Sequence, residues 1–307
     1  MPTTIRRNSF FQPPTIMSLT VLTDVVEEGH FYIINTVSVI AHALLIWLII
    51  YKNKSINGNY VKLMIIFSVA HIVYSILTSI ILPNNHHLPN GGVYFTVRGF
   101  LMSRETLCFG MFVALLNSFN WIITLLFVLF LYRYRIVTDV AKLNKPTGRL
   151  TESFILFIAT TTSYNYLLYL LYPTAEDNVS TEEVLEQYGI NSSQSSYIAA
   201  IFWNEKENGD YVYNKARIVG VVLNMAWLSL LIISMIYIGY TIRRKLQDKH
   251  FSPFVKSLQT QIVHILFVQM IIYFITFFLP LLIPAACVFF ELNQFKFETN
   301  ITFSLPG

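Results

Sequence analysis

Charged residues are scarce in this sequence, and the scarcity limits the classes of protein to which it can belong. Only 12% of the 307 residues are Asp, Glu, Lys or Arg, and 54% are hydrophobic. Soluble globular domains carry about 25% charged residues. Since the apolar residues also gather in long runs, we interpret the chain as an integral membrane protein and exclude a soluble domain.

Motifs of hydrolytic, nucleotide-binding and metal sites are absent. The sequence has no HExxH, GxSxG or P-loop pattern. Its seven histidines are scattered, and the adjacent His86 and His87 fall in a predicted loop, where neighbouring side chains point in different directions. We therefore predict no enzyme activity, no catalytic residue, no cofactor and no metal ligand.

Cysteine is rare, and the two cysteines are Cys108 and Cys287. Both fall near the outer ends of predicted spans, where the compartment permits a disulfide. A bridge needs a short distance between the two Cα atoms, which the sequence does not reveal. A disulfide and two buried thiols therefore stay open as alternatives.

Long apolar runs are what the sequence has in abundance, and six of them are long enough to cross a bilayer. A transmembrane helix needs about 20 predominantly apolar residues. The runs do not alternate as barrel strands do, and backbone groups in lipid must satisfy one another, so we expect helices. The predicted spans are residues 31–51, 61–82, 107–131, 153–172, 218–242 and 262–290. The expected fold class is all-α, a polytopic membrane helix bundle.

Basic residues concentrate in the first, third and fifth predicted loops, whereas the long fourth loop is acidic. A bias of Lys and Arg in short loops marks the cytoplasmic side. The prediction therefore places residues 1–30 and 291–307 outside the cell. The net charge of +4 follows from this topology and requires no nucleic-acid partner. The basic loop residues are Lys52, Lys54, Arg133, Arg135, Lys142, Lys145, Arg149, Arg243, Arg244, Lys245, Lys249 and Lys256.

Glycosylation sequons agree with this orientation. Asn178 and Asn191 lie in the fourth loop, and Asn300 lies in the tail, each followed by a Ser or Thr two positions later. Acceptor asparagines of this kind lie on surface loops of exported segments. All three are candidate glycosylation sites in the predicted topology.

Some residues inside the spans are unusual for a lipid environment. His42, His71 and His264 fall at membrane depth, where ionisable groups are costly and often functional. A neutral histidine can also hydrogen-bond to a neighbouring helix, and we favour this packing role over ligand contact for all three. Pro280 in the sixth span removes a helix donor, so we expect a kink there.

Three stretches together resemble one known family. Residues 51–83 resemble the first cytosolic loop and second helix of nematode serpentine chemoreceptors of the Str superfamily. Residues 126–137, LFVLFLYRYRIV, resemble that group's helix-three signature, and residues 257–280 resemble the start of its helix six. The resemblance covers about residues 25–290, with the blocks in the family's order. Its characteristic helix-six positions are Leu258, Gln259, Gln261, Gln269 and Pro280.

The resemblance implies a rhodopsin-like seven-helix receptor that binds a small molecule or odorant outside and activates a heterotrimeric G protein inside. It places Tyr132, Arg133 and Tyr134 at the G-protein-coupling end of helix three. Arg133 stands where rhodopsin-like receptors carry the arginine of their helix-three motif. The resemblance also suggests the plasma membrane, specifically the ciliary membrane of sensory neurons. No motif identifies the ligand pocket.

The sequence departs from the family pattern at several positions. His42 stands about where the family commonly has Asn, and Tyr273 replaces a proline often found shortly after Gln269. Cys108 lacks its usual partner, because the fourth loop contains no cysteine. Residues 291–307 cannot span a bilayer, so we expect the chain to lack the seventh helix and to end outside.

Two alternative functions stay open. The chain could be a truncated receptor remnant that does not signal, as the missing seventh helix suggests. It could also be a subunit of a ligand-gated channel or transporter, which would need a polar stripe along the spans. The polar residues that the spans offer for such a stripe are Asn35, Asn117, Asn120, Asn165 and Asn224.

Overall fold

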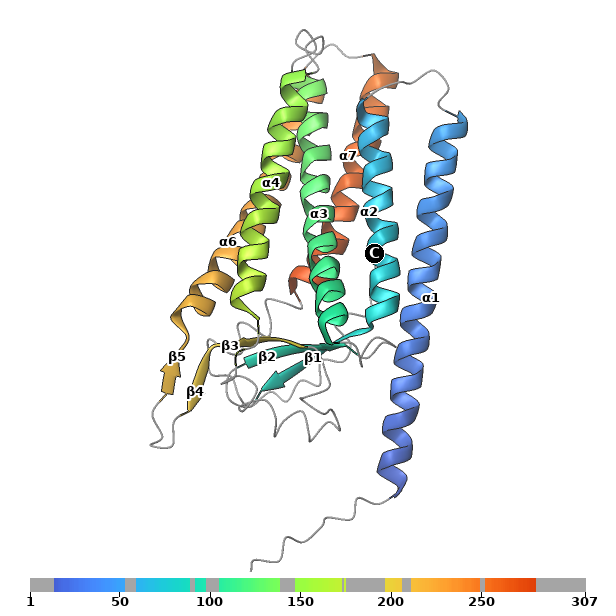
Figure 1. The fold of residues 1–307 in the computed structure, drawn as a ribbon. Helices are drawn as coiled ribbons and strands as arrows, with labels where there is room; N and C mark the ends of the chain where they lie inside the picture. The colour runs from blue at the N-terminus through green and yellow to red at the C-terminus, as the bar shows by residue number, and fades with distance from the viewer. Residues whose placement is uncertain are drawn as a thin grey trace, which may run out of the picture.

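Six long helices form an up-and-down bundle in the part of the chain that the structure describes (Figure 1). The helices are α1 (Pro14–Lys52), α2 (Asn59–Ile81), α3 (Glu105–Thr138), α4 (Thr147–Leu170), α6 (Lys215–Asp248) and α7 (Pro253–Tyr273), the last continued by the π-helix η2 (Phe274–Phe278). The computed structural model describes residues 14–52, 59–88, 92–97, 105–138, 147–172, 174, 197–205, 211–248 and 252–279.

Each predicted span overlaps one of these helices, although the bounds differ. The first helix begins at Pro14, so part of the segment predicted to precede the first span is helical. Residues 280–290 of the predicted sixth span and the tail at 291–307 lie outside the described residues. Four helices hold apolar stretches long enough to cross a membrane: Glu28–Tyr51, Tyr60–Ile81, Phe109–Thr138 and Lys215–Gln247. A shorter apolar stretch covers Phe154–Leu170. The chain is a polytopic bundle of membrane helices.

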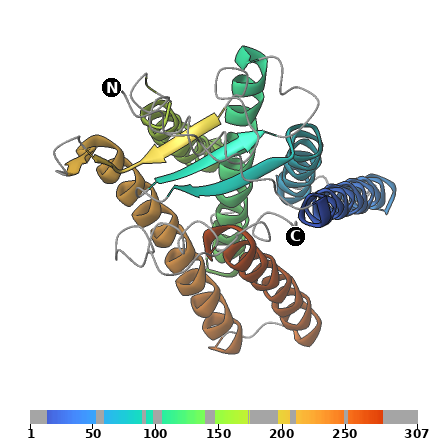
Figure 2. The ribbon, with the colours of Figure 1, turned by 90° about the horizontal axis from the view of Figure 1, so that it is seen from below.

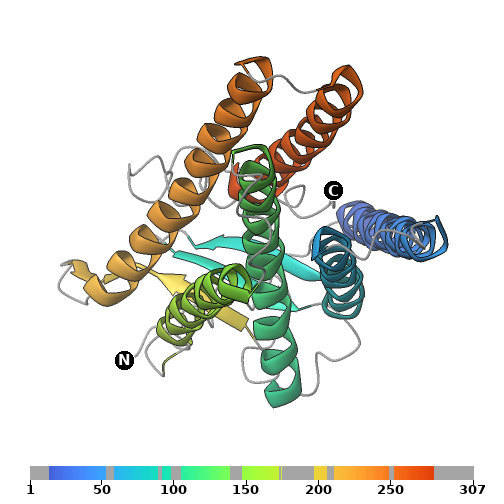
Figure 3. The ribbon, with the colours of Figure 1, turned by 90° about the horizontal axis from the view of Figure 1, so that it is seen from above.

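The third helix runs through the centre of the bundle. Figure 3 shows α3 crossing the middle of the molecule, and it contacts α2, α4, α6 and α7. Its apolar span is 67% buried, whereas 17% of the α1 span and 22% of the α6 span are buried. The largest fully buried side chains include Phe112, Ile122, Leu126 and Phe130 of this helix. Because lipid is as apolar as this core, the outward faces of the other helices are apolar too, and packing rather than hydrophobicity distinguishes inside from outside.

Two small antiparallel sheets lie at one end of the bundle, where the sequence predicted only loops (Figure 2). Strands β1 (Pro83–Leu88) and β2 (Gly92–Val97) form a hairpin between α2 and α3. Strand β3 (Tyr197–Ile201), from the fourth loop, pairs with β2, and β4 (Trp203–Glu205) pairs with β5 (Tyr211–Tyr213). His86 and His87 therefore lie in a strand rather than in an irregular loop. The pairing of β3 with β2 joins segments about 100 residues apart and leaves no local pattern, which is why the sequence did not reveal that pairing.

A buried arginine joins the start of α6 to the end of α4. Arg217 is 3% exposed, and its Nε donates a hydrogen bond to the carbonyl oxygen of Leu170 at 2.9 Å. Its Nη2 donates to the carbonyl of Tyr172 at 3.2 Å. The last carbonyls of a helix lack intrahelical partners and attract a cation, so this side chain caps the end of α4. The side chain of Asn214 accepts a bond from the Arg217 N–H at 3.2 Å, as an N-cap residue does.

The sixth and seventh helices approach each other closely at a glycine. A Cβ atom added at Gly239 of α6 would overlap the ring of Phe267 in α7. That ring also contacts Phe130 of α3 edge-on, with 5.5 Å between ring centres. Glycine therefore permits a close contact of α6, α7 and α3 that any larger residue would disturb.

We predict that Gly239→Ala destabilises the protein. Overpacking typically costs about 1–3 kcal/mol, which exceeds the gain of about 0.5–1 kcal/mol from replacing a helical glycine. Gly110→Ala is the matched control, because nothing lies within 4 Å of the added Cβ there. Thermal unfolding of the purified protein should give a lower midpoint for Gly239→Ala and an unchanged or higher midpoint for Gly110→Ala. Equal midpoints for the two variants would contradict the close approach.

Candidate functional site

Basic side chains gather at the end of the bundle opposite the strands. There α1, α3 and α6 end, and α2, α4 and α7 begin (Figure 1). The described basic residues of this end are Lys62, Arg133, Arg135, Arg243, Arg244, Lys245 and Lys256. Since the sequence places the basic loops in the cytosol, we refer to this end as the inner end.

Arg133 is the buried member of this basic group, and it connects three helices. The residue lies near the end of α3 and is 6% exposed. Its guanidinium carbon stands 3.5 Å from the centre of the Tyr60 ring in α2. Its Nη1 donates a long hydrogen bond, 3.4 Å, to Oε1 of Gln259 in α7. The Tyr60 ring also stacks on Tyr132, with 5.8 Å between ring centres. We call Tyr60, Arg133 and Gln259 the inner cluster.

The inner cluster holds a cation with few partners. A cation–π contact contributes about 0.5–2 kcal/mol, depending on how far water is excluded. A bond of 3.4 Å is weaker than the usual distance near 2.9 Å. Within the described residues, Nε of Arg133 has no hydrogen-bond partner. A group that offers Arg133 stronger hydrogen bonds can therefore displace these contacts.

The other predicted residues of this end take different positions. Tyr134 is half-buried, and its carbonyl accepts a bond from the hydroxyl of Thr138 at 2.9 Å. Gln261 is exposed on α7, and Gln269, further along the same helix, is half-buried. Of the predicted glutamines, the structure brings only Gln259 to Arg133. Sequence reasoning missed Tyr60, which belongs to no motif of its own and meets Arg133 through the packing of α2 on α3.

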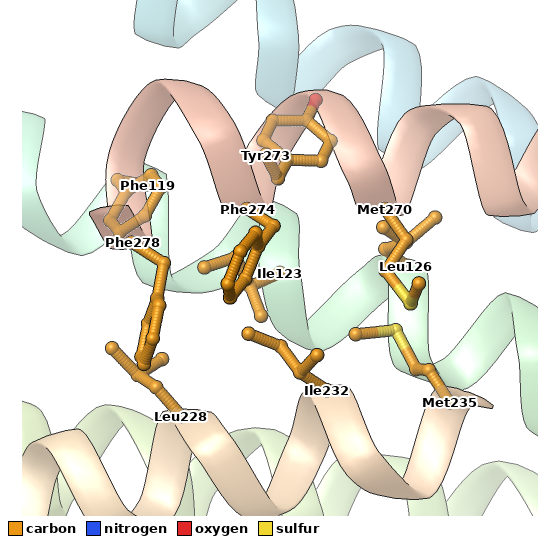
Figure 4. Close-up of a pocket in the computed structure, with 10 residues that line it drawn as sticks. All are labelled: Phe119, Ile123, Leu126, Leu228, Ile232, Met235, Met270, Tyr273, Phe274 and Phe278. Atoms are coloured by element: carbon orange, nitrogen blue, oxygen red, sulfur yellow. The ribbon is translucent and has the colours of Figure 1, made fainter. Parts of the chain in front are cut away.

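A narrow apolar pocket lies halfway along the bundle between α3, α6 and the end of α7 (Figure 4). The pocket has a volume of about 10 Å³, close to the space that one water molecule needs. A ligand of more than a few atoms would require the lining side chains to move. The lining residues are Phe119, Ile123, Leu126, Leu228, Ile232, Met235, Met270, Tyr273, Phe274 and Phe278.

One wall of the pocket is the π-helix that continues α7. The N–H of Leu279 donates to the carbonyl of Phe274, five residues earlier, which widens the helix by one residue per turn. The rings of Phe274 and Phe278 stack 5.3 Å apart along this wall. The widening directly precedes Pro280, which cannot donate to the carbonyl of residue 276 and would clash with it in a regular α-helix. The kink predicted at Pro280 itself falls outside the described residues.

A polar contact inside the bundle links α7 to α2 behind the pocket. The hydroxyl of Tyr273 lies within hydrogen-bond distance of the His71 imidazole. The ring of His42 in α1 stacks on His71, with centres 4.3 Å apart and planes inclined by 11°. Both His71 and Tyr273 are buried. Two positions that depart from the family pattern, His42 and Tyr273, thus meet at one histidine, whereas His264 is exposed on α7.

The contact between His71 and Tyr273 should contribute measurably to stability. Hydrogen bonds between membrane helices average about 0.6 kcal/mol and reach about 1.7 kcal/mol in double-mutant cycles. We predict a coupling free energy in this range from the cycle of His71→Phe, Tyr273→Phe and the double variant. Unfolding in a denaturing detergent provides the measurement. Tyr166→Phe, at a ring that is 65% exposed on α4, is the control and should cost little. Additive effects of the two substitutions would show that the contact contributes nothing.

Two of the five asparagines considered for a pore pair two helices. Asn117 and Asn165 exchange hydrogen bonds of 2.9 and 3.1 Å between α3 and α4. Trp121 and Thr161 form a further bond of 3.2 Å between the same helices. Among the described residues, the amide atoms of Asn35 are buried without a hydrogen-bond partner. Within the part of the chain that the structure describes, the five asparagines therefore do not join one hydrogen-bonded network.

Several predicted residues cannot be placed. The side chain of Cys108 and the whole of Cys287 lie outside the described part, so their pairing stays open. The candidate glycosylation sites Asn178, Asn191 and Asn300 also lie outside it. Metal ligands were not expected, and among the described residues no group of three or more His, Cys, Asp or Glu side chains gathers.

Comparison with known proteins identifies the family. Residues 30–306 match the family described as serpentine type 7TM GPCR chemoreceptor Str. The G-protein coupled receptor str-33 of Caenorhabditis elegans is 24% identical over 277 residues, which cover 87% of this chain and 79% of that relative. The match confirms the resemblance that the three stretches indicated, and it extends over nearly the whole chain. The chain belongs to the Str family of serpentine, seven-transmembrane chemoreceptors.

Proposed function

We propose that the protein is a chemosensory receptor that binds a small molecule from the outer side and activates a heterotrimeric G protein at its inner end. Family membership supports a receptor rather than an enzyme or a pore. The inner cluster is the observation that carries the proposal, because it presents a buried, incompletely bonded arginine where the helix ends of a G-protein-coupled receptor meet their partner.

In the proposed mechanism, activation requires that α7 break its contact with Arg133 in the inner cluster. At rest, Gln259 holds α7 against Arg133, and Tyr60 holds the guanidinium from the other side. A ligand shifts such an equilibrium only by binding the two states with different affinity. Because the bond from Arg133 to Gln259 is long, a modest difference in ligand affinity suffices to separate them. The freed guanidinium could then donate to carbonyl groups of a G-protein segment.

The loop charges support the proposed orientation, and the chemoreceptor family supports the proposed location. We place the inner end in the cytosol and the N-terminal side outside, because Lys and Arg favour the cytoplasmic face. Arg243, Arg244 and Lys245 at the end of α6 then form, with the third loop, a basic surface for the G protein. We propose the plasma membrane as the site of action, and the ciliary membrane of a sensory neuron as the specific location.

Removal of the arginine tests the proposal directly. Arg133→Ala should abolish ligand-evoked G-protein activation, because no other described residue of the inner end is a buried cation. Lys215→Ala, at an exposed base at the start of α6 on the opposite end of the bundle, is the control and should retain activation. The measurement is nucleotide exchange on a co-expressed G protein at equal surface expression. Full activation by Arg133→Ala would contradict the proposed role of Arg133, whereas a wild-type protein that activates no G protein would favour the non-signalling alternative.

Removal of the glutamine should have the opposite effect. Gln259→Ala deletes the bond that joins α7 to Arg133, so basal G-protein activation should rise in the absence of ligand, by roughly threefold to tenfold if the lost contact is worth about 0.6–1.4 kcal/mol. Gln261→Ala changes the same residue type two positions away on an exposed site and should leave basal activation unchanged. If the two variants behaved alike, the inner cluster would have no role in holding the resting state.

A further inference from the structure

The outward face of α6 changes in character from the middle of the helix to its inner end. Four large side chains come first, with exposed fractions between 47% and 68%: Ile233, Ile236, Tyr237 and Tyr240. Two exposed bases follow them, Arg243 and Arg244. We call these six residues the α6 stripe.

The spacing of the α6 stripe places its members on one face of the helix. Residues three, four or seven positions apart are neighbours on a helix surface. Tyr240 precedes Arg243 by three positions and Arg244 by four, and Ile236 precedes Arg243 by seven. The opposite face of the helix packs on the bundle through the buried residues Met235, Ile238, Ile242 and Leu246. The two arginines therefore point in the same outward direction as the isoleucines.

The order of side chains along the α6 stripe follows the layers of one lipid leaflet. Arg244 lies about 16 Å further along the helix axis than Ile233. This length is close to half of the hydrocarbon thickness of about 30 Å. Ile233 then lies among acyl chains, and Tyr237 and Tyr240 lie at the interface, where tyrosine is enriched. Arg243 and Arg244 reach the depth of the headgroups.

Lipid can reach this face of α6. The helix lies at the edge of the bundle (Figure 3), and 22% of its apolar span is buried. Lys245, the next base after the pair, is half-buried and does not share the outward face. The pair of arginines is thus the part of this basic segment that faces lipid directly.

We propose that Arg243 and Arg244, together with the hydroxyl of Tyr240, bind the headgroup of an anionic phospholipid. A guanidinium matches the geometry of a phosphate and can bind it through two parallel hydrogen bonds. From Tyr240 to Lys256 the sequence has five bases and one acid, Asp248, so the segment is complementary to an anionic leaflet. Basic segments that directly follow a membrane helix are attracted to such a leaflet.

The occupant is a lipid rather than a free phosphate compound. A soluble headgroup could reach the two guanidinium groups, but it would leave the rest of the α6 stripe without a partner. Acyl chains pack along Ile233 and Ile236 at the same time as the phosphate meets the arginines. The proposal does not depend on the receptor function, and it gives two residues of the basic surface for the G protein a contact with the membrane.

Native mass spectrometry of the full chain in neutral detergent tests the proposal. The probes are phosphatidylserine, phosphatidylcholine and glycerophosphoserine, which carries the serine headgroup without acyl chains. The readout is the apparent dissociation constant of the first bound probe. Arg243→Gln/Arg244→Gln removes the pair from exposed positions, so the core stays intact. Lys62→Gln/Lys215→Gln removes the same charge from exposed positions of α2 and of the start of α6, and it is the control.

We expect the wild-type protein to bind phosphatidylserine more tightly than phosphatidylcholine. Arg243→Gln/Arg244→Gln should weaken binding of phosphatidylserine at least roughly tenfold, because each base near an anionic surface contributes separately. The control should keep the wild-type affinity, and Arg243→Lys/Arg244→Lys should keep most of it, since the charge remains. Glycerophosphoserine should bind at least roughly tenfold more weakly than phosphatidylserine, because it gains no apolar contact.

Several outcomes would overturn the proposal. Equal affinity of the wild-type protein for phosphatidylserine and phosphatidylcholine would remove the selection for charge. Equal losses in the arginine variant and in the control would reduce the effect to net charge. Equal affinity for glycerophosphoserine and phosphatidylserine would make the occupant a soluble headgroup.

The test separates the lipid site from the receptor function. If Arg243→Gln/Arg244→Gln kept the affinity for phosphatidylserine but lost G-protein activation, the pair would serve the G protein alone and the lipid site would be rejected. Loss of lipid binding in this variant, together with activation that survives Arg133→Ala, would support the lipid site and reject the role of Arg133.

Discussion

The central position of α3 is the constraint on which the rest of the structure depends. In lipid, every backbone polar group must be satisfied within its own helix, and apolar surface alone does not hold helices together. Specific contacts to one central helix supply that cohesion here. Asn117 pairs with α4, Phe130 meets the ring of Phe267 in α7, and Arg133 joins α2 to α7. Both candidate sites lie on this helix, about two turns apart between Leu126 of the pocket and Arg133.

The last described helix, α7, with its π-helical continuation contributes residues to the inner cluster, to the pocket and to the contact with His71. Gln259 of α7 bonds to Arg133 at the inner end, and Met270, Tyr273 and Phe274 line the pocket. Tyr273 also contacts His71, which ties α7 to α2. These sites belong to α7 and its π-helical continuation, so we propose that a displacement at the pocket changes the geometry at Gln259. A long hydrogen bond at the inner end and a π-helix at the pocket are the two weak points at which such a helix can move.

Local patterns predicted part of this structure, and tertiary packing decided the rest. Spans, loop charges and the Tyr-Arg-Tyr run are local features, so the membrane bundle and the position of Arg133 near the inner end of α3 could be read from the sequence. The role of Tyr60 could not be predicted, because its contact with Arg133 depends on how α2 packs on α3. The pocket residues are ordinary apolar side chains in ordinary spans, and only convergence of three helices distinguishes Ile232 from its neighbour. The pairing of β2 with β3 was missed because these strands come from different loops.

The distance between the inner ends of α4 and α7 tests the central claim most directly. Phe154 of α4 and Phe254 of α7 are 62% and 76% exposed, so spin labels at these positions should not disturb the core. With Cys108 and Cys287 replaced by serine, pulsed electron paramagnetic resonance would report the distribution of distances between the two spin labels. The account predicts that Gln259→Ala shifts the distribution to longer distances and broadens it, whereas Gln261→Ala leaves it unchanged. Identical distributions for the two variants would show that Arg133 and Gln259 do not hold α7 in place.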